Sequence, residues 1–250
     1  MATTMAGVRF ALEGRVARLT LAAPDRGNRF SPAMALELAD ACERCEDDDV
    51  WVVRLDAEGK DFCLGVEGDS KEWPELAGAD FVAALARITR PIVATVQGRA
   101  ESEGLELALA ADLRIVGPAT VFSMRQVEHG SLPRFGGTQR LPRIVGVERA
   151  FRAILLGEAI DGREALSVGL AARLDDDLDR AAADVAATLA ARGPVALRFA
   201  KEAVRRAPDL ALDDGARFEH DLYSLLQTTR DRAEGIRAFL EKRKPEFHGD

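Results

Sequence analysis

Short apolar runs alternate with amphipathic segments over residues 1–194. Two-residue periodicity near the N-terminus predicts a β-hairpin, and the later continuous apolar runs predict buried strands. The strands are expected at residues 8–12, 15–21, 50–55, within 59–68, and at 91–96, 113–116, 121–122 and 170–174. Helical periodicity and capping residues predict helices at 31–47, 76–88, 147–156, 162–168, 178–191 and 194–206. This alternation of strands and helices predicts an α/β fold.

The segment 91–116 has the pattern of a strand, a turn, a helix and a second strand. Its turn contains Gly98, Ser102 and Gly104, which favour unusual backbone conformations, and we expect Ser102 to cap the helix. Unpaired N–H groups at such a helix start bind anions and developing oxyanions. Glu106 lies just inside the helix among apolar neighbours, where a carboxylate is costly unless it is used. The segment therefore predicts half of an active site.

After residue 194 the strand signals stop and only helical patterns remain. Phe218, Leu222 and Leu225 form one apolar stripe, and a further helix is expected at 232–242. Such a stripe must be buried against the chain's own core or against another subunit, and composition does not choose between them. We therefore divide the chain into a core, 1–194, and a helical C-terminal region, 195–250.

Composition restricts the classes of partner. The formal net charge of −8 argues against nucleic acid as the main ligand, because phosphate binding needs concentrated Lys and Arg. No apolar run reaches the roughly 18 residues of a membrane span, and residues 1–7 do not resemble a signal peptide. We expect a cytoplasmic protein with neither a membrane nor a nucleic-acid partner.

Cysteine and histidine spacing indicates neither disulfides nor a metal site. Cys42 and Cys45 form a C-x-x-C, but they share a helical apolar stripe with Met34 and Leu38, so we expect buried free thiols. The histidines are scattered and match no metal-ligand spacing.

Five motifs follow one another in an order that is typical of one enzyme family. They are Phe62-Cys63-Leu64-Gly65-Val66, Glu106-Leu107-Ala108 with Ala111-Asp112-Leu113-Arg114-Ile115, Gly136-Gly137-Thr138-Gln139-Arg140-Leu141-Pro142-Arg143, Ile160-Asp161 to Gly169-Leu170, and Phe239-Leu240-Glu241-Lys242-Arg243-Lys244-Pro245-Glu246-Phe247. On these residues the chain resembles the enoyl-CoA hydratase/isomerase (crotonase) family over nearly its whole length.

The resemblance implies a crotonase-like spiral of ββα units whose C-terminal helices pack into homotrimers or homohexamers. It also implies an acyl-coenzyme A thioester as substrate, with coenzyme A entering as part of that substrate and no further cofactor. The backbone N–H groups of Val66 and Glu103 would hold the oxygen of a thioester enolate, and Glu106 would be the acid/base.

Other positions match residues that contact coenzyme A in the family. Those that would line the coenzyme A channel are Arg26, Gly27, Leu64 and Gly68. Those that would reach the nucleotide end of a neighbouring subunit's ligand are Phe239 and Lys242. These assignments rest on the resemblance alone.

Three departures from the family pattern concern the reacting end of the substrate. Gln126 occupies the position of a second catalytic glutamate, and an amide orients water but does not exchange protons near neutral pH. Glu103 replaces a small residue, and its carboxylate either enters the pocket or is solvated at the helix start. Arg134 and Phe135 replace small residues and would reshape the acyl pocket.

These departures leave alternatives open. Arg134 either pairs with Glu103 or Glu128, or meets a polar or carboxylate group of the acyl chain. Glu128 or His129 could replace the missing carboxylate. The first hypothesis is an acyl-CoA enzyme of the hydratase/isomerase type. The alternatives are a single-base isomerase, hydrolase or decarboxylase of an unusual acyl-CoA, and a non-catalytic acyl-CoA-binding oligomer.

Overall fold

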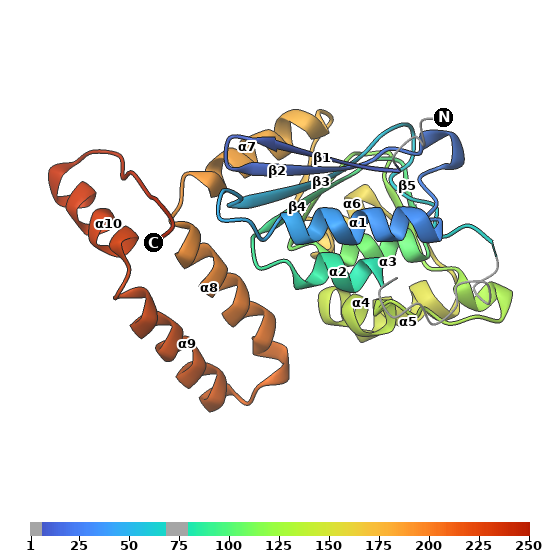
Figure 1. Cartoon of the computed structure of the whole chain (residues 1–250). Coiled ribbons are helices and arrows are strands. Elements are labelled where there is room, and N and C mark those ends of the chain that lie inside the picture. Colours follow the sequence, from blue (N-terminus) through green and yellow to red (C-terminus); the bar gives the residue numbers. More distant parts are fainter. Residues whose placement is uncertain (1–6, 69–79) are drawn as a thin grey trace.

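The computed structural model describes residues 7–68 and 80–250. Its main sheet has six strands in the spatial order β1 (Val8–Glu13), β2 (Val16–Leu21), β3 (Val52–Ala57), β4 (Ile92–Val96), β6 (Leu113–Val116) and β9 (Arg173–Leu174) (Figure 1). β1 and β2 form the predicted antiparallel hairpin, and each later pair of neighbours is parallel.

A second, smaller sheet lies where the sequence predicts a turn and one short strand. β5 (Arg99–Glu101) pairs in parallel with β7 (Val121–Ser123), which pairs antiparallel with β8 (Ile160–Asp161). An isolated bridge between Cys63 and Ala100 attaches the 59–68 segment to β5. This segment is therefore a loop held by single bridges, and the short strand expected within it does not form.

The helices confirm the α/β class. They are α1 (Pro32–Arg44), α2 (Phe81–Arg87), α3 (Glu103–Ala110), α4 (Gly137–Val145), α5 (Val147–Leu155), α6 (Gly162–Ser167), α7 (Leu178–Ala190), α8 (Pro194–Arg206), α9 (Leu212–Leu226) and α10 (Arg230–Glu241). The sequence pattern does not predict α4, and the first part of the helix expected at 76–88 lies outside the described residues. Among the helices of the described chain, none has the length and apolar character of a membrane span.

The main sheet lies between two groups of helices (Figure 1). Apolar residues on one face pack with α1, α2 and α3, and on the other face Val93 and Ile115 pack with Ala181 and Ala182 of α7. Burial on both faces explains why these strands have nearly continuous apolar runs. Cys42 and Cys45 belong to the core between the sheet and α1, where they are buried free thiols, as expected.

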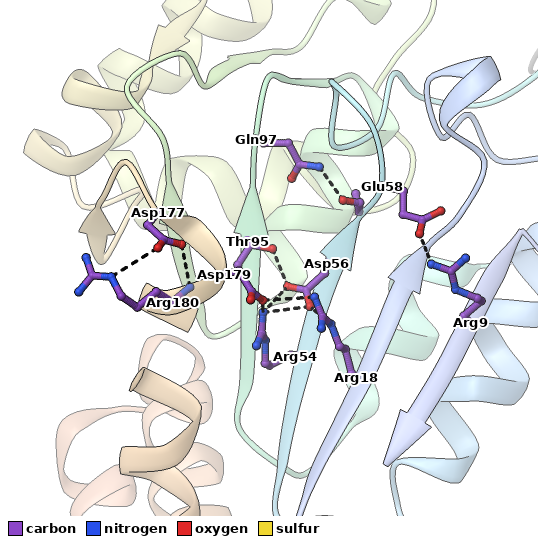
Figure 2. A network of polar contacts seen from close by, with 11 residues as sticks. Arg9, Arg18, Arg54, Asp56, Glu58, Thr95, Gln97, Asp177, Asp179 and Arg180 are labelled. Atoms are coloured by element: carbon purple, nitrogen blue, oxygen red, sulfur yellow. Dashed lines mark hydrogen bonds and ion pairs between the residues drawn. The ribbon is translucent and has the colours of Figure 1, made fainter. Parts of the chain in front are cut away.

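Charged residues also occupy the face of the sheet that α7 covers (Figure 2). The Asp56 carboxylate accepts hydrogen bonds from Arg18 Nε (2.6 Å), Thr95 Oγ1 (2.6 Å) and Arg54 Nη2 (3.3 Å). Arg54 also donates to Asp179 of α7, at 2.7 Å. Because Arg54 and Asp56 are both buried, each needs the other to offset the loss of hydration. The network joins the sheet to α7.

Every residue of α3 is buried, and the helix contacts α2 and α4. Its C-terminal end is closed by Arg114, whose Nη1 donates to the carbonyl oxygens of Ala108 (3.2 Å) and Ala111 (2.7 Å). The last turn of a helix leaves such carbonyls without internal partners, so the buried guanidinium satisfies them. Burial lowers the pKa of Arg114 to about 10.

The C-terminal helices α8, α9 and α10 project away from the sheet (Figure 1). They confirm the expected helical C-terminal region, and several of their apolar side chains are uncovered, with Leu212 87 % and Phe239 82 % exposed. Whether 1–194 and 195–250 are separate domains stays a prediction.

Candidate active site

Glu106 is fully buried on α3 and is held by hydrogen bonds from three directions. Its Oε1 accepts from the backbone N–H groups of Phe135 and Gly137, each at 2.8 Å. Its Oε2 accepts from Nε2 of Gln126 at 3.3 Å. Burial raises the pKa of Glu106 to about 7, although the two backbone N–H groups oppose this shift. A carboxyl group with such a pKa can exchange protons near neutral pH.

Gln126 begins a short 3-10 turn, Gln126–His129, and its side chain is buried beside Glu106. Its Nε2 donates to Glu106, whereas its Oε1 is buried without a hydrogen-bond partner in the described part of the chain. A buried acceptor of this kind is costly unless a ligand or water donates to it. Gln126 is therefore placed to accept one hydrogen bond from a molecule beside Glu106.

The way its loop is attached leaves the backbone N–H of Val66 out of the hydrogen bonds of that attachment. Val66 forms a parallel bridge with Phe30, in which Phe30 N–H donates to Gly65 and Glu67 N–H donates to Phe30. The bridge thus uses the residues on either side of Val66. Among the described residues, none accepts a hydrogen bond from the Val66 N–H. The residue before it, Gly65, has φ +101°, a conformation that side chains other than glycine rarely adopt.

Within residues 7–68 and 80–250, no group accepts a hydrogen bond from the backbone N–H of Glu103, because this N–H is the first of α3. Ser102 stands at the N-cap position, but its side chain accepts no hydrogen bond from the helix, so the capping prediction is wrong. Ser102 has φ +51° and its N–H donates to Ser123 O at 2.8 Å. The start of α3 is therefore held by the backbone hydrogen bond from Ser102 to β7 and not by a serine cap.

A cavity of about 510 Å³ brings these groups together. The expected site residues that line it are Leu64, Val66, Gly68, Glu103 and Gln126. Its wall also contains Arg29, Glu101, Ser102, Arg125, His129 and Ser131. Glu106 has no exposed surface, and its carboxylate contacts the cavity wall through the side chain of Gln126.

Arg29 is one of the wall residues that the sequence analysis missed. It precedes Phe30, and the bridge from Phe30 to Val66 carries it to residues 62–66, which we call the oxyanion loop, where its guanidinium donates to Leu64 O. The sequence held one indication of this role, because Arg29 lies two residues after Gly27, which was expected in the coenzyme A channel. Arg26 and Gly27 lie beside this loop: Leu64 N–H donates to Gly27 O at 3.0 Å, and Arg26 pairs with Glu67 at 3.1 Å.

Arg134 and Phe135 do not line the cavity. The Arg134 side chain is exposed and lies over the Phe135 ring, 4.8 Å from its centroid. The Phe135 ring packs against Phe81, with centroids 5.0 Å apart. Glu128 pairs with Arg125 at 2.7 Å, and no ion pair joins Arg134 to Glu103 among the described residues. The Phe135 ring therefore packs on α2, and only its backbone N–H contacts Glu106.

Phe239 and Lys242 lie at the C-terminal end of α10, and neither lines the cavity of its own chain. Lys242 has φ +55° and caps the helix through its backbone N–H. Their expected role toward a neighbouring subunit stays a prediction.

The chain was also compared with known proteins. The family model described as "Enoyl-CoA hydratase/isomerase" matches residues 12–250. The 2,3-dehydroadipyl-CoA hydratase of Escherichia coli (strain K12) is 34% identical over 244 residues, which cover 94% of this chain and 96% of that protein.

Solved structures agree with this match. The enoyl-CoA hydratase of Bacillus anthracis superposes with a TM-score of 0.93 at 30% identity, covering 98% of this chain and 100% of that one. The enoyl-CoA hydratase of Mycobacterium tuberculosis H37Rv has a TM-score of 0.91 at 28% identity, covering 98% and 100%. These likenesses confirm the expected crotonase-like fold, and the chain belongs to the enoyl-CoA hydratase/isomerase family.

Proposed function

We propose that this protein is an enzyme that acts on acyl-CoA thioesters through a thioester enolate. The backbone N–H groups of Val66 and Glu103 hold the enolate oxygen, and Glu106 moves the proton. The observation that carries the proposal is Glu106 itself, a buried carboxyl group with a pKa of about 7. It lies beside a cavity whose wall has two backbone N–H groups that no described residue accepts from. Each preorganised donor of this kind contributes about 3 kcal/mol to the transition state.

A single carboxylate supports isomerisation of a double bond most directly. The Glu106 carboxylate removes a proton from one carbon of the acyl chain, and the electron pair passes into the enolate. The carboxylic acid then returns the proton to another carbon, so that atoms and charges balance. The neutral amide of Gln126 favours this one-base chemistry, because it cannot supply a second proton.

Hydration is the other reaction that the site supports. The Escherichia coli relative is named as a hydratase of 2,3-dehydroadipyl-CoA, which makes 2,3-enoyl thioesters the first substrates to assay. Here Oε1 of Gln126 accepts a hydrogen bond from the attacking water, and Glu106 takes the water's proton as the oxygen bonds to the chain. With only one carboxylate, Glu106 also returns that proton to the enolate carbon.

The test is Glu106→Gln, assayed for crotonyl-CoA hydration and for isomerisation of a 3-enoyl-CoA. Loss of the acid/base is expected to lower kcat by at least about 100-fold. Glu43→Gln is the matched control, since Glu43 is an exposed residue of α1. The wild-type kcat/KM should rise with pH through about 7, because Glu106 must be ionised to act as a base. Unchanged turnover in Glu106→Gln would exclude this role.

The complete burial of Glu106 favours one alternative, a non-catalytic oligomer that binds acyl-CoA. The Glu106 carboxylate meets the cavity wall at Gln126, so it reaches substrate only if Gln126 moves or if the acyl chain enters beside it. Micromolar binding of several acyl-CoA thioesters by calorimetry, with no turnover of any of them, would support this alternative over the enzyme.

We also propose that the protein assembles as a homotrimer or homohexamer and needs no cofactor beyond the coenzyme A of its substrate. The uncovered apolar faces of α9 and α10, including Leu212 and Phe239, support assembly. Phe239→Ala is expected to raise KM for a CoA thioester but not for an N-acetylcysteamine thioester, which lacks the nucleotide. An equal change in both KM values would argue against a nucleotide contact. Light scattering gives the number of subunits.

A further inference from the structure

Glu103 carries a carboxylate that the mechanism above does not use. The residue is only 9 % exposed and lines the candidate cavity. Within residues 7–68 and 80–250, no group donates a hydrogen bond to this carboxylate and no cation pairs with it. The nearby Glu101 differs, because it pairs with Arg99 at 3.5 Å. Because the side chain lines the cavity, water or a bound ligand can donate to the carboxylate there.

The carboxylate lies at the carbonyl end of the proposed thioester. A β-carbon built on Gly65 would be 2.7 Å from Oε2 of Glu103, and Gly65 directly precedes Val66. The backbone N–H of Glu103 is the other proposed donor to the enolate oxygen. The side chain is thus beside the oxyanion loop, within reach of a substituent on the carbon next to the thioester carbonyl.

A cation lies near the same point. Nη1 of Arg29 would be 3.7 Å from that β-carbon on Gly65, yet the guanidinium donates to Leu64 O and forms no ion pair with Glu103 among the described residues. The cavity wall therefore offers an acceptor and a donor side by side. A hydroxyl group fits both, because it donates to a carboxylate and accepts from a guanidinium.

The charge of Glu103 also acts on the reaction. Glu103 and Glu106 are three residues apart on α3 and so share one side of the helix. The charge of Glu103 contributes to the raised pKa of Glu106. A bare carboxylate opposes a developing enolate, whereas a carboxylate bound to a substrate hydroxyl opposes it less. A substituent that donates to Glu103 therefore favours both binding and chemistry.

We propose that Glu103 is a specificity-determining residue that accepts a hydrogen bond from a hydroxyl group on the acyl carbon next to the thioester carbonyl. The site then prefers 2-hydroxyacyl-CoA over the unsubstituted thioester. This inference rests on the proposed function, since it assumes that the thioester carbonyl lies at the Val66 and Glu103 N–H groups.

The test is calorimetric titration with butyryl-CoA, 2-hydroxybutyryl-CoA and malonyl-CoA. A hydrogen bond to a charged acceptor is expected to make 2-hydroxybutyryl-CoA bind at least about tenfold more tightly than butyryl-CoA. Glu103→Gly keeps the backbone N–H and should bring the two affinities within about twofold of each other. Glu103→Gln should give an intermediate ratio, and Glu43→Gln, the control on the exposed face of α1, should keep the wild-type ratio.

The outcomes separate this inference from the proposed function. Equal wild-type affinities, or a preference that survives in Glu103→Gly, would overturn the role of Glu103 while leaving an acyl-CoA site. Tightest binding of malonyl-CoA would also overturn it, because a carboxylate substituent would then be recognised by Arg29 instead. Failure of all three thioesters to bind would refute the proposed function itself.

Discussion

Replacing Glu106 with glutamine should remove activity and at the same time stabilise the folded protein at alkaline pH. Glutamine has nearly the same shape, and its Oε1 can accept the two backbone N–H bonds that now go to Glu106. Gln126 can turn its free Oε1 toward the new amide. The substitution therefore removes a buried charge without leaving a cavity. It takes the acceptor from Nε2 of Gln126, a cost that does not change with pH.

The magnitude follows from the pKa of Glu106, which rises from 4.5 to about 7 on folding. Between these values the native state binds more protons than the unfolded state, so wild-type stability falls as pH rises through this window. One pKa unit corresponds to about 1.4 kcal/mol, so the ionised carboxylate costs roughly 3 kcal/mol above pH 7. About 2.5 kcal/mol of this cost develops between pH 5 and pH 8.

The assay is urea unfolding of the wild type and Glu106→Gln at pH 5 and pH 8, at one protein concentration because assembly affects apparent stability. The stability of the variant relative to wild type should increase by roughly 2 to 3 kcal/mol from pH 5 to pH 8. The shared change of all other groups cancels in this difference. A difference that stays constant with pH would show that Glu106 is not a buried carboxyl group with a raised pKa.

Three further predictions concern the site and its support. Gln126→Glu restores a second carboxyl group beside the catalytic glutamate and should raise crotonyl-CoA hydration about 100-fold; an unchanged rate would show that the amide does not limit hydration. Asp56→Asn leaves the buried Arg54 without its main counter-charge and should lower the free energy of unfolding by about 3 kcal/mol in urea titrations; a loss below 1 kcal/mol would contradict the network. Gly104→Ala places a methyl group 2.1 Å from the backbone carbonyl oxygen of Cys63 and should lower the free energy of unfolding by about 3 kcal/mol in the same assay. Gly117→Ala is the control, because the nearest atom to its new methyl group is 3.8 Å away, and it should lower the free energy of unfolding by under about 1 kcal/mol.

The local sequence pattern was sufficient to predict those elements whose periodicity and capping residues lie within the element itself. The hairpin formed as predicted, and α8 spans Pro194–Arg206 as expected, because Gly193 and Pro194 define its start within the sequence. Glu106 was identified because a carboxylate inside an apolar helix is unusual whatever surrounds that helix. The order of the motifs carried the family resemblance, which the comparisons confirm.

Tertiary structure decided what depends on contacts between distant segments. Gly136, Gly137 and Pro142 are typical of a loop, yet α4 begins at Gly137, whose N–H is held by Glu106. Ser102 looked like a helix cap, but its backbone is tied to β7 instead.

The cavity wall was decided in the same way. Arg29 reaches the oxyanion loop only because Phe30 bridges to Val66, and the Glu103 carboxylate is buried only because that loop packs over the start of α3. Sequence alone determined which residues could do chemistry, because charge and periodicity are local properties. The fold determined which of them share a cavity, because burial and hydrogen-bond partners come from segments far apart in the chain.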